Sequence, residues 1–186
     1  MMSKRRGAFS AIAEWVGVFL IAFAVFALVR TFVVSPYVVP SGSMLPTIQV
    51  GDSIFAQKVT MRLGMDPADG DIVVFDNPVP SSEHAILVKR VIAHAGQTVD
   101  LVDGAVYVDG QRLDEPYAQG STFPLPSQAP GVQVKFPFTV PEGCVWVMGD
   151  NRENSADSRY FGPVPRENLV GVAFMRYWPL DRIGLM

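Results

Sequence analysis

The strongest structural signal in this chain is an apolar run near its N-terminus. Trp15–Val29 is fifteen residues long without a charge and lies between Glu14 and Arg30. A helix needs about 20 mostly apolar residues to cross a bilayer, and residues 15–34 reach that length if Arg30 extends its side chain toward the headgroups. The run therefore predicts a transmembrane helix over residues 15–34, which accounts for a mean hydropathy of +0.24.

The charges around the run predict its orientation. Lys4, Arg5 and Arg6 precede it, and basic residues that flank a span stay in the cytoplasm. Residues 1–14 are then cytoplasmic, and residues 35–186 lie on the outer side of the membrane. A cleavable signal peptide is the alternative, but its apolar core spans about 7–15 residues and ends at a small-x-small site. No such site follows this run.

The remainder of the chain carries β-strand patterns. The stretches "DSIFAQKV", "DIVVFD", "AILVKRVIA" and "VWVM" are rich in β-branched and aromatic residues and are bounded by Gly, Asp or Pro. Asp103-Gly104 lies between two alternating runs, which predicts a hairpin, and Asp109-Gly110 predicts another turn. We therefore expect one mainly β domain, since this length does not suit two comfortable domains.

Residues 113–141 have a different composition. They hold six of the fifteen prolines in the chain. Proline cannot donate a hydrogen bond to a strand ladder, so a long loop or an irregular edge excursion is expected here.

Charge and cysteine content exclude other classes. The net charge is −3, and because the first six residues carry +3, the other 180 sum to −6. A basic surface for nucleic acid is therefore not expected. Cys144 is the only cysteine, so no disulfide can form within the chain. Its strand-like surroundings predict a small buried side chain.

Lys89 is a candidate general base. The stretch "AILVKRVIA" places its amine in a run that is apolar on both faces. Burial lowers the pKa of a lysine from about 10.4, and a neutral lysine can accept a proton from a serine hydroxyl. Arg90 cannot, because guanidinium stays protonated. Taken alone, this position also suits a paired strand lysine, and His84 and His94 are interpreted as strand-end side chains.

The stretch "VVPSGSML", residues 38–45, supplies a candidate nucleophile. Gly42 lets the backbone approach a substrate closely, and the flanking prolines stiffen the loop. Ser43 can present its hydroxyl outward, while Ser41 can donate to a developing oxyanion beside the Ser43 N–H. As an isolated pattern, Ser-Gly-Ser also fits a polar linker.

A third polar stretch is "MGDNRENSADSRYFGPVP", residues 148–165. An EF-hand calcium loop needs acids or Asn at positions 1, 3 and 5 and Gly at position 6. Counted from Asp150, the third residue is Arg152 and the sixth is Ser155, so this type of metal site is excluded. A solvated loop is the other interpretation.

Together these stretches resemble bacterial type I signal peptidase, the membrane-anchored serine protease that removes signal peptides from exported proteins. "PSGSMLPT" resembles the nucleophile box, "GDSIFAQK" and "GDIVVF" two strand boxes, "VKRVIAHAGQTV" the lysine box, and "GDNRENSADSRYFGPVP" the last box. The resemblance covers nearly the whole chain. It implies an antiparallel β-sheet catalytic domain with one N-terminal transmembrane helix in the bacterial cytoplasmic membrane. Signal peptides and membrane lipid are the implied partners, without metal or cofactor.

The resemblance also implies residue roles. Ser43 is the nucleophile, Lys89 is the general base, and Ser41 with the Ser43 N–H forms the oxyanion hole. Ser155 orients the lysine through a hydrogen bond. Asp157 and Arg159 form an ion pair that supports the site. The residues implied for shallow S1 and S3 pockets, which take small side chains at −1 and −3 of the substrate, are Tyr37, Val39, Pro40, Met44 and Val88.

Two alternatives stay open at this point. Some relatives have two spans and a large insertion. This chain is expected to have one span, and it carries the Pro-rich stretch 113–141 in place of the insertion. A conjugation-type peptidase of the same chemistry would have a narrow substrate, but such relatives carry extra cysteines. A silent membrane-tethered module that binds exported chains is the other alternative. The joint presence of Ser43, Lys89 and Ser155 argues against it.

Overall fold

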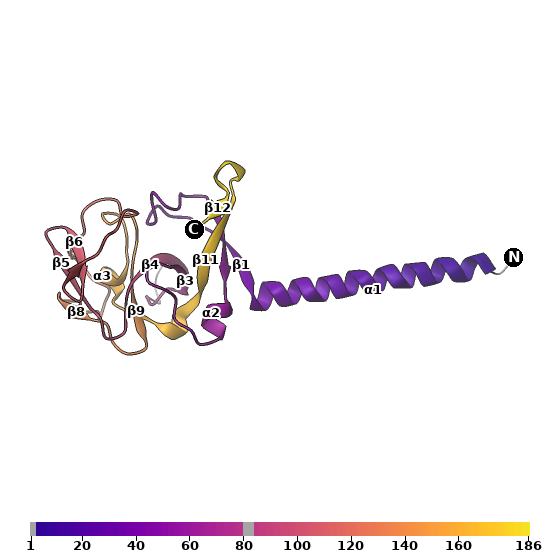
Figure 1. The fold of residues 1–186 in the computed structure, drawn as a ribbon, viewed down its shortest axis with the longest axis horizontal. Helices are drawn as coiled ribbons and strands as arrows, with labels where there is room; N and C mark the ends of the chain where they lie inside the picture. The colour runs from indigo at the N-terminus through magenta and orange to yellow at the C-terminus, as the bar shows by residue number, and fades with distance from the viewer. Residues whose placement is uncertain (1–2, 80–83) are drawn as a thin grey trace.

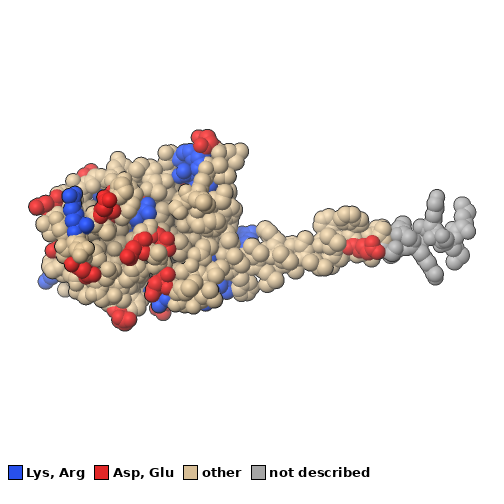
Figure 2. Space-filling view, in the orientation of Figure 1, with Lys and Arg blue, Asp and Glu red and all other residues tan. Residues whose placement is uncertain are grey.

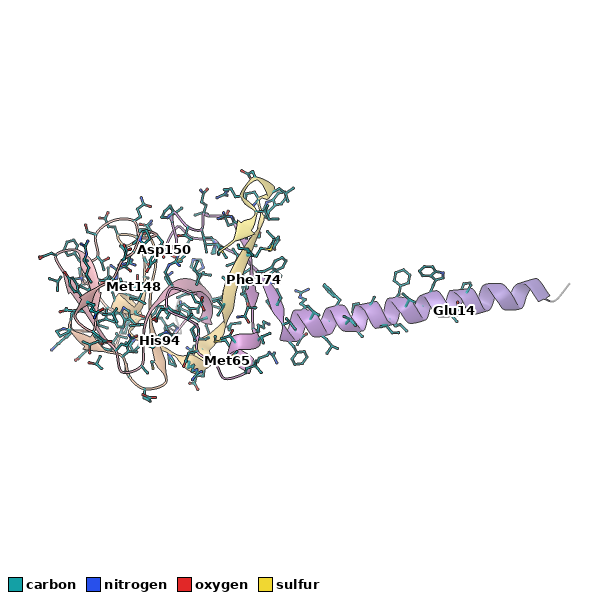
Figure 3. All side chains as sticks on the ribbon, in the orientation of Figure 1. Glu14, Met65, His94, Met148, Asp150 and Phe174 are labelled. Atoms are coloured by element: carbon teal, nitrogen blue, oxygen red, sulfur yellow. The ribbon has the colours of Figure 1, made fainter. Side chains whose placement is uncertain are left out.

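The computed structural model describes residues 3–79 and 84–186, and it joins a long N-terminal helix to a β-rich body (Figure 1). The helix, α1, is Ser3–Phe32. Its part Ala11–Phe32 is the only helix of the described chain that is long and apolar enough to cross a membrane, judged by length and composition. Figure 2 shows an uncharged length of this helix next to the body, and Glu14 lies farther out (Figure 3).

Helix α1 differs from the predicted span at both ends. It begins before Trp15 and ends at Phe32 rather than at Val34. The carbonyl of Val33 accepts a hydrogen bond from the Lys58 N–H (2.8 Å), and β-pairing begins with the next residue. The helix therefore ends early because the chain joins a strand ladder. The membrane crossing and its orientation stay predictions.

A large antiparallel sheet forms most of the body. Over the described residues it has eight strands in the order β1-β2-β11-β3-β4-β9-β10, with β12 paired to β11. The strands are β1 Val34–Val38, β2 Ser53–Gln57, β3 Ile72–Asp76, β4 Ile86–His94, β9 Cys144–Met148, β10 Val164–Pro165, β11 Leu169–Trp178 and β12 Gly184–Leu185. Each pairing is antiparallel. The mainly β, antiparallel prediction is thus confirmed.

The centre of this sheet is buried on both faces. Successive side chains of a strand point to opposite faces, and in β3 Val73 and Phe75 join one apolar core while Ile72 and Val74 join another. Lys89 in β4 is the cross-strand partner of Val73. Because directly paired residues share a face, Lys89 lies on the face of Val73.

A smaller sheet covers the other end of the body. Within the described chain its strand order is β7-β6-β5-β8, from Thr98–Val102 (β5), Ala105–Val108 (β6), Gln111–Arg112 (β7) and Phe138–Thr139 (β8). The hairpin predicted at Asp103-Gly104 is present, with both residues at positive φ (50° and 78°). Short helices complete the body: α2 Val59–Arg62, α3 Ser158–Phe161, η1 Arg166–Asn168 and η2 Leu180–Arg182.

Residues 113–141 run irregularly along the body and contribute only β8 as a named strand. Part of this segment, including Val134 and Val140, packs with Trp146 in the core of the smaller sheet. Cys144 was expected to be buried, but it is only half-buried. It starts β9 at the edge of that core, where the sheet no longer covers it completely.

Candidate active site

The loop between β1 and β2 carries Ser43 and is fixed at its base and by its own core residues. Val39 N–H donates to the Asp52 carbonyl (2.9 Å), which closes the loop. Met44 and Ile48 are fully buried in the core against β2 and β3. With its neighbour anchored in the core, Ser43 is held in place and is only 9% exposed.

The structure brings Lys89 to Ser43 although 46 positions separate them in the sequence. Lys89 Nζ donates to Ser43 Oγ at 2.7 Å and to the Val88 carbonyl at 3.0 Å. Lys89 is 2% exposed. Both side chains of the predicted pair therefore meet in a site that excludes most water.

The surroundings of Lys89 change its protonation. Burial lowers the pKa of the ammonium from its usual value to about 8, against the opposing attraction of Asp157 and Asp150. The sign follows from desolvation, which penalises the charged form of a base. A substantial fraction of Lys89 is therefore neutral near pH 8, and this neutral amine can accept a proton.

Two cavities open beside the Ser43–Lys89 pair. The first is about 370 Å³ and is lined partly by Asn154 and Tyr160. The second is about 320 Å³. Both are also lined by Ser41, Ser43, His84, Leu87 and Lys89. Ser41 and Ser43 therefore lie at the boundary between the two cavities.

The predicted pocket residues divide between the second cavity and the core. Four of them line that cavity: Tyr37, Val39, Pro40 and Val88. Met44 is fully buried and packs with Val39 and Ile54. Met44 thus belongs to the apolar core under the loop rather than to an open surface.

Ser155 lies close to Ser43 without the predicted contact to Lys89. Its buried Oγ has no hydrogen-bond partner within residues 3–79 and 84–186, so the expected bond to Lys89 is not formed in this structure. Ser155 packs instead against Gly149. A Cβ on Gly149 would lie 2.7 Å from Ser155 Cβ and 2.5 Å from the Ser43 carbonyl oxygen, so only glycine fits there.

Asp157 and Arg159 form a buried, two-pronged ion pair. Arg159 Nε and one terminal nitrogen donate to the Asp157 carboxylate at 2.9 and 2.8 Å. Asp157 also accepts from the Gly149 N–H (3.1 Å), and Arg159 donates to the Arg152 carbonyl (2.8 Å). The pair therefore holds the turn that starts at Gly149.

Sequence reasoning missed several residues of this turn. Asp150, which lies inside the body (Figure 3), accepts from Arg90 at 2.8 and 2.6 Å and from Thr47 Oγ1 at 2.5 Å. Asn151 donates to the Gly42 and Ser43 carbonyls, both at 3.1 Å. These residues all lie in the quoted boxes, but their contacts are seen only in the folded chain.

The two histidines differ in position. His84 lines both cavities, whereas His94 pairs with Asp69 at 3.0 Å on the partly exposed end of β4. Lys89, rather than His94, therefore faces the Ser43 hydroxyl.

Comparison with known proteins shows the family of the chain. The family described as "Signal peptidase, peptidase S26" matches residues 12–178. A probable signal peptidase I-2 of Synechocystis is 43% identical over 162 residues, covering 85% of this chain and 69% of that protein. A probable signal peptidase I-1 of the same organism is 39% identical over 179 residues, covering 93% and 86%. A solved signal peptidase I from Enterococcus faecalis aligns with a TM-score of 0.43 and 31% identity, covering 57% of this chain and 96% of that one.

Proposed function

Since the chain belongs to the signal peptidase family, peptidase S26, it is a serine endopeptidase that cleaves signal peptides, and we propose that Ser43 and Lys89 are its nucleophile and general base. The observation that carries the proposal is the 2.7 Å contact between Lys89 Nζ and Ser43 Oγ. A nucleophile and a base within hydrogen-bond reach are the signature of an activated serine.

Acylation begins with neutral Lys89. Its amine accepts the Ser43 hydroxyl proton while Oγ attacks the carbonyl carbon of the residue at −1. Ser41 Oγ and the Ser43 N–H donate to the oxyanion of the tetrahedral intermediate, a type of contact worth about 10²–10³ in kcat. The Lys89 ammonium then gives its proton to the leaving amine. The mature protein departs, and the signal peptide stays as an ester on Ser43.

Deacylation repeats the proton transfers with water. Lys89 accepts a proton from a water molecule, whose oxygen attacks the ester carbonyl, and the proton returns to Ser43 Oγ as the C–O bond breaks. The signal peptide leaves with a new carboxylate. Burial of Lys89 supports both steps, because it lowers the pKa of the amine to about 8 and so keeps a neutral base available.

Substrate selection follows from the second cavity. Tyr37, Val39, Pro40 and Val88 present apolar walls, and Met44 is packed into the core under the loop. We assign this cavity to the small side chains at −1 and −3 that the resemblance implies. Preproteins with a small-x-small site are therefore the proposed substrates.

The location of the site follows from the link between α1 and β1. Ser43 lies only eleven positions after Phe32, the end of α1. With the basic N-terminus in the cytoplasm, the groove lies at the outer leaflet of the bacterial cytoplasmic membrane. Exposed aromatic side chains such as Phe32 and Trp178 (47% and 53% exposed) then contact lipid.

Cleavage of a preprotein with an Ala-x-Ala site tests the proposal. The full chain in detergent is incubated with the preprotein, and the products are weighed by intact-mass analysis. We expect cleavage after the −1 alanine with wild type and none with Ser43→Ala. Cleavage that persists in Ser43→Ala would exclude Ser43 as nucleophile. No cleavage by wild type would favour the narrow-substrate peptidase or the silent binder.

A further inference from the structure

The irregular segment 115–122 lies against the catalytic turn 149–152, and we propose that Glu115 is a positioning residue that fixes this turn, and through it Ser43, by holding Arg152. The inference rests on the proposed function of Ser43. Glu115 belongs to the Pro-rich stretch, which has no role in the chemistry described above.

The first link is a buried ion pair. Arg152 donates to both oxygens of the Glu115 carboxylate, at 2.9 and 2.5 Å, and the side chains are only 1% and 10% exposed. The same guanidinium donates to Thr122 Oγ1 (2.9 Å) and to the Gly149 carbonyl (3.0 Å). Arg152 therefore links both ends of segment 115–122, at Glu115 and Thr122, to Gly149 at the start of the turn.

The second link is a short parallel β-bridge between Gln119 and Asn151. The Gln119 N–H donates to the Asp150 carbonyl (2.7 Å), and the Arg152 N–H donates to the Gln119 carbonyl (2.9 Å). Backbone pairing on both sides of Asn151 fixes where its own N–H and amide point.

The third link joins the turn to the nucleophile. Asn151 donates its backbone N–H to the Ser43 carbonyl and its side-chain amide to the Gly42 carbonyl, both at 3.1 Å. These two carbonyls belong to the peptide groups on either side of the Ser43 Cα. A shift of the turn therefore moves Ser43 relative to Lys89.

Segment 115–122 also reaches the lysine strand. The Tyr117 ring stacks under the Arg90 guanidinium (3.9 Å from its carbon to the ring centre), and Tyr117 Oη donates to Glu115 (3.2 Å). Arg90 adjoins Lys89 in β4 and also binds Asp150. Glu115 thus connects to both members of the proposed catalytic pair.

Loss of the Glu115 carboxylate leaves the Arg152 cation buried without its partner, which displaces the turn. Misplacement of reacting groups by about 1 Å costs on the order of 100-fold in rate. We expect Glu115→Ala to lower kcat about 10- to 100-fold. The Michaelis constant KM should change little, because Glu115 is not among the residues that line the cavity with Tyr37, Val39 and Val88.

The experiment measures kcat and KM on the Ala-x-Ala preprotein with the full chain in detergent. Glu115→Gln keeps one oxygen that accepts from Arg152 but loses the negative charge, so its kcat should lie between those of wild type and Glu115→Ala. Asp114→Ala is the matched control, since Asp114 is the exposed neighbour, and it should behave as wild type. Thermal unfolding of each variant shows which are folded at the assay temperature.

A double-mutant cycle gives the second readout. If Glu115 acts through Arg152, Glu115→Ala should have little further effect on kcat in an Arg152→Gln background. Full additivity of the two substitutions, or a folded Glu115→Ala with wild-type kcat, would overturn the inference. If Glu115→Ala does not fold, a wild-type kcat for both Glu115→Gln and Arg152→Gln would overturn it equally. Absence of cleavage by wild type would instead contradict the proposed function.

Discussion

The two ends of the β-rich body differ in what they bury. Near the Ser43–Lys89 pair, five buried side chains carry or can carry charge: Lys89, Asp150, Arg152, Asp157 and Arg159. At the other end, no buried polar residue of the described chain lies in strands β5 to β8, and apolar residues surround Trp146. Buried charges add little net stability even when paired. The apolar core around Trp146 therefore contributes mainly to stability, whereas the buried charges near Ser43 mainly maintain the geometry of the site.

Within the polar end, Lys89 stands apart. Asp150, Arg152, Asp157 and Arg159 each have an oppositely charged partner. Lys89 donates instead to the neutral Ser43 hydroxyl and to a carbonyl. Burial without a directly paired carboxylate lowers the pKa of Lys89, and this is the physical reason for proposing Lys89 as the base.

The largest expected effect is the loss of activity in Lys89→Met. A general base contributes about 10²–10⁴ in rate, so cleavage of the preprotein should fall by that factor or more. Stability should rise at pH 7 by about 1 kcal/mol, because an apolar side chain replaces a buried amine. Preprotein cleavage and urea unfolding, measured on one preparation, check the expected fall in activity and the expected rise in unfolding free energy. An inactive variant that is also clearly less stable than wild type would contradict the proposal that buried charges near Ser43 add little net stability.

The pH dependence of the unfolding free energy gives a second test of Lys89. The pKa of Lys89 is about 8 in the folded chain and about 10.5 when unfolded. Between these values the unfolded chain binds more protons, so the wild-type free energy of unfolding rises with pH. Lys89→Met should lack this rise. Parallel slopes for the two proteins between about pH 8 and 10 would show that Lys89 has no lowered pKa.

The next effect is on stability at the polar end. Asp157→Asn removes one charge of a fully buried pair and leaves Arg159 uncompensated, which costs about 3–5 kcal/mol in free energy of unfolding. Cleavage should fall as well, because Asp157 also holds the Gly149 N–H. Asp69→Asn is the control, since its pair with His94 is exposed on the Asp69 side. Equal losses in the two variants would contradict the assignment.

The smallest effect is expected at the apolar end. Val106 is fully buried in the core of the smaller sheet, and Val106→Ala should cost about 1–3 kcal/mol of unfolding free energy. The kcat of the folded fraction should stay at the wild-type value, because no residue of the core around Trp146 is among those that line the two cavities beside Ser43. A kcat loss without a stability loss would show that this end takes part in positioning the site.

Local patterns in the sequence predicted much of the fold. Asp103-Gly104 predicted its hairpin because turn geometry depends on a few neighbouring residues. The apolar run predicted α1, although not its ends, because the joining of Val33 to Lys58 depends on a partner distant in sequence. The half-buried Cys144 shows the same limit, since strand composition does not reveal which edge stays uncovered.

The site was predictable where motifs name residues and not where contacts are long-range. Ser43 and Lys89 were recognisable in their boxes. The pairs Arg90–Asp150 and Glu115–Arg152 are separated by 60 and 37 positions, and no local pattern links their members. Gly149 likewise gave no signal in the sequence. A side chain there would collide with Ser155 and the Ser43 carbonyl, and the fold alone brings these groups together.

The decisive test of Lys89 as the general base is the pH profile of kcat/KM for preprotein cleavage, because kcat/KM reports the ionisation of the free enzyme. With Lys89 as the base, kcat/KM should rise with pH and level off above an apparent pKa of about 8. A profile governed by a group near pH 6.5, the ordinary value of histidine, or one without any rise, would contradict the assignment of Lys89 as the general base.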